Sequence, residues 1–461
     1  MTDSRPGRTP NVDPVAVAAG ANRSQLLPVL RIPEFVAFSI SQAVSLFGDK
    51  LDYMALLAMI AYFAQQFHWE SARAISWLSV VVALPTILFG PLAGILVDRW
   101  DRRKVMVVCD SFRTVLVLAI PLLALATNNL YLIYSIAFLV FLFGLFFNTA
   151  RMSIIPNLVG QERVLGANSF MNLIGRVATF LGMVVGGLVV DWSGWLRFRI
   201  NPVWTAGFYL DALTYLVSVI VLLVIFRRLA DSGRARAAPP RRHDEVKVFF
   251  AQQSRMLREV RELWQVVVRE PAVMFVYASI LMFVLLGAAV FVLYIPIIQS
   301  APDLPGAPGL GMGTRGVGYV AAIGSLGLVV SSIVFGAFGH RLKKHKVMLW
   351  SFLVLGLVAA GLAVSKSFAP VAPLAFIAGL ALSPVNIGMD TLLHEVVPES
   401  ARGRVFSTRD WLIHLLFALA ALLIGQLTAF FPVRRLLFAV GVLVVAITIA
   451  GFFFTRGRRI A

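Results

Sequence analysis

The sequence has few charged residues: Asp, Glu, Lys and Arg together make up 14% of its 461 residues. An ordinary soluble domain carries roughly 25%, so a soluble globular enzyme and a disordered chain are both excluded. The single cysteine, Cys109, excludes a disulfide scaffold and a C-x-x-C centre. Hydrophobic residues, in contrast, reach 59%, which predicts a polytopic membrane protein whose helices face lipid.

Several motifs that carry chemistry are also missing. The sequence has no G-x-x-x-x-G-K-[ST] loop for ATP, no nucleophile–base motif and no compact set of metal ligands. The pattern G-x-G-x-x-G occurs at 311–316, but no strand precedes it, so it reflects loop composition. We therefore expect no enzyme, no ATP-binding site, no cofactor and no metal.

Long apolar runs recur at nearly regular spacing along the chain. Each is long enough for a membrane helix of about 20 residues. The turns at 126–129 and 431–435 separate the third span from the fourth and the eleventh from the twelfth. The predicted spans are 34–66, 75–97, 105–126, 130–150, 165–190, 204–226, 272–299, 316–339, 347–365, 368–394, 405–430 and 433–455.

The formal charge of +18 could suggest nucleic acid, but membrane proteins collect Lys and Arg in their cytoplasmic loops. With the N-terminus inside, 31 of the 41 Lys and Arg residues lie on the inner side and 7 on the outer side. No cleavable signal peptide is visible. We therefore expect both termini in the cytoplasm and no nucleic-acid partner.

The hydrophilic segments predict five regions. We expect a cytoplasmic tail over 1–33, a six-helix bundle over 34–226, a basic linker over 227–271, a second six-helix bundle over 272–455 and a tail over 456–461. Within the linker, apolar residues at helical spacing alternate with basic ones, which indicates an amphipathic helix on the inner membrane surface.

The two predicted bundles are related by an internal repeat. The segment 94–106 matches 336–348 at an offset of 242, and both segments follow the second span of their half. Gly48 in the first span falls near Gly287 in the seventh, at an offset of 239. The fold class is therefore an all-α membrane protein with twelve helices in two pseudo-symmetric bundles. Such repeats are typical of secondary transporters, whose substrate site lies between the halves.

The segment 94–104 resembles the loop signature of the major facilitator superfamily, G-x-x-x-D-R-x-G-R-R, with Asp101 where the general signature has Gly. The variant D-R-x-D-R-R, and the segments 155–169 and 397–407, resemble the drug- and siderophore-exporter branch. A weaker resemblance, through Phe47-Gly48-Asp49 and the glycines of the fifth span, is to bacterial lysophospholipid transporters. The resemblance implies alternating access and does not define a substrate.

Charged groups inside membrane spans are costly and are functional candidates by default. Asp49 and Asp52 lie three residues apart and share a helix face, whereas Lys50 points about 100° away. We predict that the two carboxyls couple transport to protons, with Lys50 and Arg176 as ion-pair partners or substrate contacts. One alternative is an ion pair that only holds helices together, and another is that the span begins later, so that the cluster lies near the outer surface.

Three other charged residues in the first half have mainly structural interpretations. Asp110 and Arg113 are one turn apart, which favours a local pair. Asp211 is followed by polar residues at helical spacing, and a packing role is favoured over transport.

The second half carries another set of candidates. Asp410 and His414 share a helix face and could carry protons, or they could form a gate or a helix-end pair. The candidates of this half are Asp390, His394, Glu395, Asp410 and His414.

The signature loop supplies the predicted cytoplasmic gate, since clustered charges can bridge helix ends in one conformation and release them in another. A role as topology anchors is the alternative. The gate residues are Gly94, Asp98, Arg99, Arg102 and Arg103.

Together these features predict a monomeric carrier of the bacterial inner membrane that exports an amphipathic, drug-like or siderophore-like molecule, in exchange for protons. One alternative is a flippase-like carrier for lysophospholipids. From another class, a non-transporting receptor or scaffold is disfavoured, because it would have no reason to carry buried charges.

Overall fold

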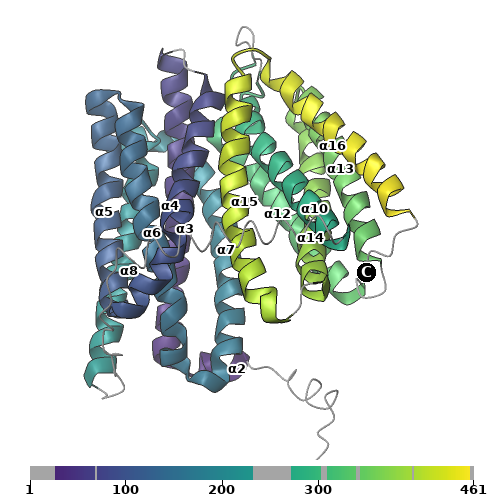
Figure 1. Cartoon of the computed structure of the whole chain (residues 1–461). Helices are drawn as coiled ribbons and strands as arrows, with labels where there is room; N and C mark the ends of the chain where they lie inside the picture. Colours follow the sequence, from purple (N-terminus) through teal and green to yellow (C-terminus); the bar gives the residue numbers. More distant parts are fainter. Residues whose placement is uncertain are drawn as a thin grey trace, which may run out of the picture.

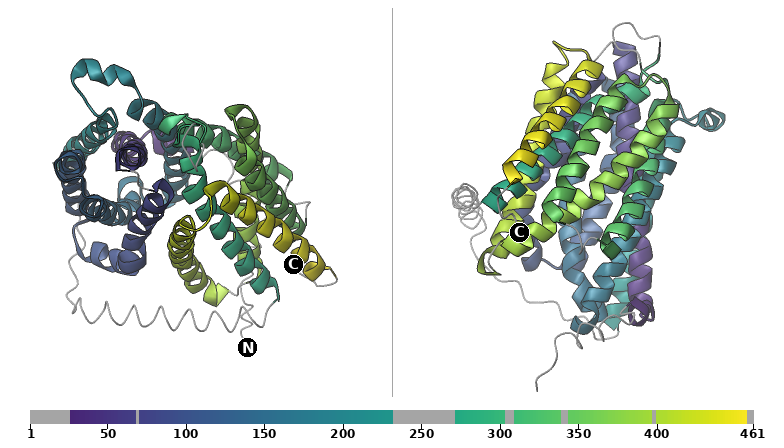
Figure 2. Two further views of the ribbon diagram at one scale, coloured as in Figure 1. Left: turned by 90° about the horizontal axis from the view of Figure 1, so that it is seen from above. Right: turned by 90° about the vertical axis from the view of Figure 1, so that its right-hand side faces the viewer.

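The computed structural model describes residues 26–67, 70–231, 271–302, 309–338, 343–396 and 399–456, and within these ranges it contains helices and no strand. Figures 1 and 2 show two neighbouring groups of long helices, one coloured purple to teal and the other green to yellow. The first group comprises α2 (Leu26–Leu30), α3 (Pro33–Phe67), α4 (Ser71–Arg99), α5 (Arg102–Thr127), α6 (Leu130–Val159), α7 (Val164–Val190) and α8 (Thr205–Asp231). The second comprises α10 (Pro271–Ala289), α11 (Ile295–Gln299), α12 (Gly313–Phe338), α13 (Lys344–Val364), α14 (Phe368–Val396), α15 (Glu399–Leu427) and α16 (Val433–Thr455).

Eleven of the described helical segments are long and apolar enough to cross a membrane. The twelfth long helix, α3, is not among them, because Asp49, Lys50, Asp52 and other polar residues interrupt its apolar sequence. The predicted all-helical class with two six-helix halves is confirmed. The exception is informative, since the helix with the poorest hydropathy is the one that carries the predicted site.

Helix α5 shows how these segments are stable in a bilayer. One face buries Cys109, Asp110, Arg113 and Val117 inside the bundle. The other face exposes apolar side chains at spacings of three or four residues: Val108, Phe112, Val115, Leu118, Leu122 and Leu125. A soluble helix would present the reverse arrangement. In lipid, the apolar face contacts the hydrocarbon and the polar groups find partners within the protein.

The turns between helices follow the sequence signals, but several helix ends differ from the prediction. Asn128 has a positive φ of 51° and ends α5, and the Asn129 side chain caps α6 by accepting from the amides of Tyr131 and Leu132. Pro432 precedes the first residue of α16. Helix α6 continues to Val159, beyond the predicted end at 150, because no helix-breaking turn occurs before Gly160.

The predicted linker begins later than expected, because α8 extends to Asp231. Its predicted amphipathic helix falls within 232–270 and lies outside the described residues. Most of the predicted N-terminal tail, residues 1–25, lies outside them as well. The linker and tail therefore stay predictions.

The internal repeat is visible in the way helices pair. Within the first group α5 contacts α6 and α8, and α3 contacts α7; within the second, α13 contacts α14 and α16, and α10 contacts α15. Between the groups, α7 contacts α12 and α15 contacts α4. Each of these pairs has its equivalent in the other half, as the offset of 242 predicts.

One element breaks the symmetry. The predicted seventh span, which corresponds to α3, consists of α10, the π-helix η3 (Val290–Tyr294) and α11. A short π-helical segment changes the direction of the side chains that follow it and is frequent at functional sites. Here it lies between the halves, where the ring of Phe291 is 5.9 Å from that of Tyr53 in α3.

Candidate functional site

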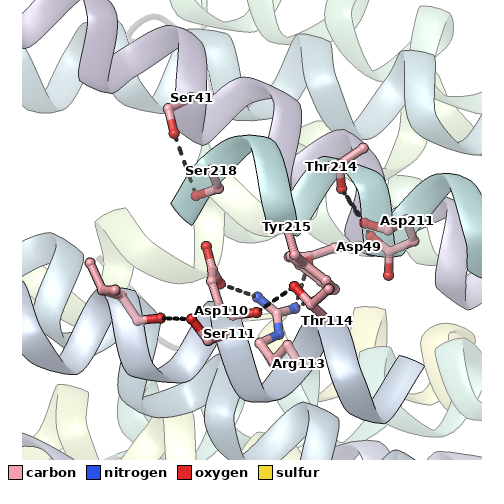
Figure 3. A network of polar contacts seen from close by, with 11 residues as sticks. Ser41, Asp49, Asp110, Ser111, Arg113, Thr114, Asp211, Thr214, Tyr215 and Ser218 are labelled. Atoms are coloured by element: carbon pink, nitrogen blue, oxygen red, sulfur yellow. Dashed lines mark hydrogen bonds and ion pairs between the residues drawn. The ribbon is translucent and has the colours of Figure 1, made fainter. Parts of the chain in front are cut away.

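The polar faces of α3, α5 and α8 meet inside the first half and form a network, which we call the buried network (Figure 3). It consists of Asp49 and Asp52 of α3, Asp110 and Arg113 of α5, and Asp211, Thr214 and Tyr215 of α8. On each helix the members lie three or four residues apart, so they share one face. The bundle positions them because these are the faces that cannot be presented to lipid.

Arg113 is at the centre of the buried network, and its side chain is only 6% exposed. Its guanidinium forms ion pairs with Asp49 and, at 3.4 Å, with Asp110. It also donates to the hydroxyl of Tyr215 and lies 4.0 Å from the centroid of that ring. The same hydroxyl donates to Asp49 over 2.6 Å. Figure 3 shows the guanidinium between the two carboxyls.

Asp211 lies against the backbone of α3 rather than against Arg113. Its carboxylate accepts from the Thr214 hydroxyl at 3.1 Å. Gly48 of α3 allows this close approach because glycine has no Cβ. A Cβ at this position would collide with both Asp211 and Thr214. Asp52, one turn further along α3, is 2% exposed. Gly48 therefore determines how closely the acids of α3 and α8 approach.

The predicted partners of Asp49 and Asp52 lie elsewhere. Lys50 faces α7, where its side chain lies against Gly182. Arg176 is exposed on α7 and forms no ion pair with the described residues. The cation that pairs with Asp49 is Arg113, which the sequence favoured only as a local partner of Asp110. That local pair exists, but it is one part of a network that joins three helices.

The predicted gate residues lie at the end of the bundle where α4 ends and α5 begins, which we call the basic end. Asp98 and Arg102 form an ion pair of 2.9 Å, and Arg102 also donates to the backbone oxygen of Ser153 in α6 over 3.1 Å. At the equivalent positions of the second half, Lys344 forms an ion pair with Glu395. Positions 102 and 344 differ by 242, as do positions 153 and 395. The repeat therefore preserves this contact between helices, but a hydrogen bond to a backbone oxygen in the first half becomes an ion pair in the second.

The remaining gate residues pack within the first half. Arg103 lies 5.7 Å from the ring of Phe226 in α8. Asp101 caps α5 by accepting from the Arg103 amide over 3.1 Å. Arg99 is the last residue of α4, and a Cβ on Gly94 would meet no atom within 4 Å. The gate role stays a prediction, because these contacts join helices of one half.

The second-half candidates do not assemble into a comparable buried cluster. Asp390 forms an ion pair with Arg409, whose Nε lies 3.8 Å from the carboxylate of Asp410. The Asp390 and Asp410 side chains are 54% and 72% exposed. His414 contacts the backbone oxygen of Asp410 at 2.8 Å, and not its carboxylate. His394 lies in α14, and its side chain is outside the described residues.

Between the described residues, the hydrogen bonds that join the two halves away from the basic end include the following four. Asp191, which follows α7, accepts from the Arg315 amide at the start of α12 over 2.7 Å. Thr428 donates to Glu70 over 3.3 Å, and Gln299 to the Leu57 oxygen over 3.4 Å. The fourth, from the Trp411 indole to the Ile87 oxygen at 2.9 Å, lies midway along α15 and α4. We call the end that holds Asp191 and Glu70 the closed end.

Asp191 lies beyond the apolar span that ends at Val190. Burial between the halves raises the pKa of its carboxyl above the usual value, and the hydrogen bonds from the backbone of Arg315 and Thr314 partly oppose this shift. The carboxylate also lies at the N-terminus of α12, where the helix dipole favours a negative charge. Opening of the closed end would expose this carboxyl to water.

Sequence reasoning missed Tyr215 and undervalued Arg113 and Asp211. The available signal was the polar spacing of Asp211, Thr214 and Ser218 in an otherwise apolar helix. This spacing predicts that α8 has a polar face, but it does not predict which helix packs against that face. The described residues contain no group of three His, Cys, Asp or Glu side chains arranged to hold a metal ion.

The comparisons with known proteins agree with this arrangement of two helical halves. The sequence model described as the Major Facilitator Superfamily matches residues 39–314 and 307–460. The chain therefore belongs to the major facilitator superfamily, a family of membrane transporters.

Individual relatives are bacterial. The uncharacterized MFS-type transporter YfiS of Bacillus subtilis is 26% identical over 377 residues, which cover 79% of this chain and 80% of YfiS. Macrolide efflux protein A of Streptococcus pyogenes is 23% identical over 420 residues, covering 90% of this chain and 94% of the relative.

Solved structures share the fold at low identity. The nucleoside transporter NupG superposes with a TM-score of 0.67 at 11% identity, covering 91% of this chain and all of NupG. A bacterial homologue of the human lysosomal transporter Spinster, in an inward-facing and unoccupied conformation, gives 0.65 at 14% identity, covering 92% and 97%.

Proposed function

We propose that this protein is a secondary transporter that exports an amphipathic small molecule across a bacterial inner membrane in exchange for protons. The observation that carries the proposal is the composition of the buried network. Four carboxyls, those of Asp49, Asp52, Asp110 and Asp211, lie in the first half near the guanidinium of Arg113, which forms ion pairs with two of them. Charges in a membrane interior are costly, and carboxyls in such sites mark proton pathways in transporters.

Alternating access provides the mechanism. Hydrogen bonds between the halves lie at the closed end and midway along the helices, whereas the ion pairs Asp98–Arg102 and Lys344–Glu395 at the basic end join helices of one half. The excess of Lys and Arg at the basic end favours a cytoplasmic location for it. In this orientation the conformation would be the one that receives substrate from the cytoplasm. Rocking of the halves would break the closed-end contacts and assemble a gate from Asp98, Arg102 and their neighbours.

The substrate class follows from two supporting facts. Macrolide efflux protein A aligns over most of this chain, and macrolides are large amphipathic molecules. Aromatic side chains where the two halves meet could contact an apolar surface of a substrate. These side chains are Tyr53, Phe291 and Phe417. A macrolide is therefore the first probe.

The test uses everted membrane vesicles and a radiolabelled macrolide, with and without an imposed gradient that makes the lumen acidic. We expect accumulation that requires the gradient in the wild type and is lost in Asp49→Asn. The matched control is Glu162→Gln, an exposed acidic residue of the same half, which should transport normally. Accumulation that does not respond to the gradient would refute proton exchange, and accumulation only in right-side-out vesicles would refute export.

A further inference from the structure

The four acids of the buried network fall into two pairs with different surroundings. Asp49 and Asp110 both contact the guanidinium of Arg113. Asp52 and Asp211 form no ion pair with the described residues, although they are 2% and 0% exposed. One carboxylate oxygen of each, Oδ1 of Asp52 and Oδ2 of Asp211, is buried without a hydrogen-bond partner there.

Asp52 and Asp211 are neighbours across the α3–α8 contact. Gly48 of α3 lies against Asp211, and further along the two antiparallel helices Ala55 lies against Gly207. Asp52 is between Gly48 and Ala55 in sequence, within about one helical turn of each. The two carboxyls are close enough to interact electrostatically.

Other charges nearby do not neutralise this pair. Lys50 is next to Asp49 in sequence but faces α7. The positive charge of Arg113 on α5 acts on both acids from a distance, but its ion pairs are with Asp49 and Asp110 and its hydrogen bond is to the Tyr215 hydroxyl. From α6, Arg151 is near Asp49 and Asp110. An unpaired carboxylate in such a place costs far more than its protonated form.

The polar face of α3 continues from the acid pair toward the basic end. Ser39 and Gln42 are fully buried, and the Ser39 hydroxyl and both amide atoms of Gln42 lack partners among the described residues. Buried polar atoms without protein partners are normally satisfied by internal water. The face therefore offers sites for water between the acid pair and the basic end.

We infer that Asp52 and Asp211 hold the exchanged proton between them, whereas Asp49 and Arg113 form a fixed ion pair that positions the neighbouring helices. When the proton leaves for water along the polar face of α3, its departure turns the carboxylic acid of the pair into a carboxylate. Two carboxylates then face each other across α3 and α8 and repel, which favours movement of these helices. This assignment rests on the proposed proton exchange and adds Asp211, a residue of α8, to the transport machinery.

The test separates proton coupling from substrate handling in Asp52→Asn and Asp211→Asn. We expect both variants to bind macrolide and to exchange labelled for unlabelled macrolide without a gradient, because the amide keeps the shape of the carboxyl. Gradient-driven accumulation should fall to the background level. Asp49→Asn should also lose thermal stability, since it removes a partner of Arg113, whereas Asp52→Asn and Asp211→Asn should keep it. Glu162→Gln is again the control.

A second measurement tests the pair without any transport. Infrared spectra of the purified protein should contain, near neutral pH, the carbonyl band of a buried protonated carboxyl, and Asp52→Asn or Asp211→Asn should remove it. If the wild type uses the gradient and both variants still accumulate macrolide, the assignment is wrong and the proposed function stands. If the wild type ignores the gradient, the proposed proton exchange fails. A band that both variants retain would overturn the acid pair by itself.

Discussion

The two halves share their helix pairing but differ in the chemistry of their cores. At an offset of 242, Asp110 and Arg113 of the first half correspond to Phe352 and Leu355 of the second, which are 0% and 4% exposed. The positions that correspond to Asp49 and Asp52, at an offset of either 239 or 242, are Ala288, Phe291 and Tyr294. An ion-pair network in one half is thus replaced by apolar and aromatic packing in the other. Both halves keep the same pattern of apolar, lipid-facing side chains, and this pattern decides which helices pair. The core residues can therefore differ between the halves without changing the helix pairing.

Under the proposed function, this difference gives the halves separate tasks. The first half contains the buried acids to which we assign proton exchange. The second contains a π-helical segment with Phe291 at the contact between the halves. An asymmetric transporter of this kind can couple proton exchange in one half to substrate contacts shared with the other.

The largest loss of stability should come from replacing Arg113 of the first half with leucine, the residue at the equivalent position 355 of the second half. Arg113→Leu leaves Asp49 and Asp110 buried without their cation, and breaking a buried pair costs about 3–5 kcal/mol. We expect a large loss of thermal stability and yield in detergent. The triple variant that also carries Asp49→Asn and Asp110→Asn should recover part of the stability. Equal stability of Arg113→Leu and the wild type would show that the network contributes nothing to folding.

The two matched glycines provide the second comparison. In Gly48→Ala the new Cβ would collide with Asp211 and Thr214, whereas at Gly287 its nearest neighbour would be a Phe417 carbon at 3.8 Å, an ordinary contact. Overpacking in a tight core costs about 1–3 kcal/mol. We expect Gly48→Ala to lower the melting temperature and gradient-driven transport, and Gly287→Ala to change neither by much. Similar effects at both sites would mean that the α3–α8 approach has no special role.

The basic end offers a smaller comparison between the halves. The Lys344 and Glu395 side chains are 25% and 41% exposed, so their pair should contribute no more than about 1 kcal/mol. A double-mutant cycle with Lys344→Ala and Glu395→Ala should give a coupling energy in that range that falls at high salt. Arg102→Ala, at the matched position, should affect stability similarly. A coupling of several kcal/mol would contradict the solvent-exposed geometry.

The smallest effect should be a pH dependence of the closed end. Because burial raises the pKa of Asp191, its contact with α12 is favoured at low pH and is weakened as the pH rises through that raised pKa. Distances between spin labels near the starts of α4 and α12 should therefore show more open molecules as the pH rises from acid toward neutral. Asp191→Asn should remove this dependence, and a dependence of the opposite sign would contradict it.

The sequence located the acids of α3 but chose the wrong neighbours for them. Helical spacing correctly placed Asp49 and Asp52 on one face with Lys50 turned away. It could not identify Arg113 as the partner of Asp49, because 64 residues separate them and spacing within a helix says nothing about the helix opposite. Tyr215 is 166 residues from Asp49 and gave no signal at all, since a single tyrosine in an apolar helix is unremarkable.

By itself, the sequence determined that the chain is a membrane protein of two repeated helical halves. Lipid requires apolar runs of a fixed length, and the loop sequences of the two halves match each other. It also determined that charges lie within a span, where their cost requires a partner. Only the tertiary structure decided which partners these are. The packing of α3 against α5 and α8 gives Asp49 an ion pair with Arg113 and leaves Asp52 and Asp211 without an ion pair among the described residues, since the identity of a buried contact depends on how helices far apart in the sequence pack together.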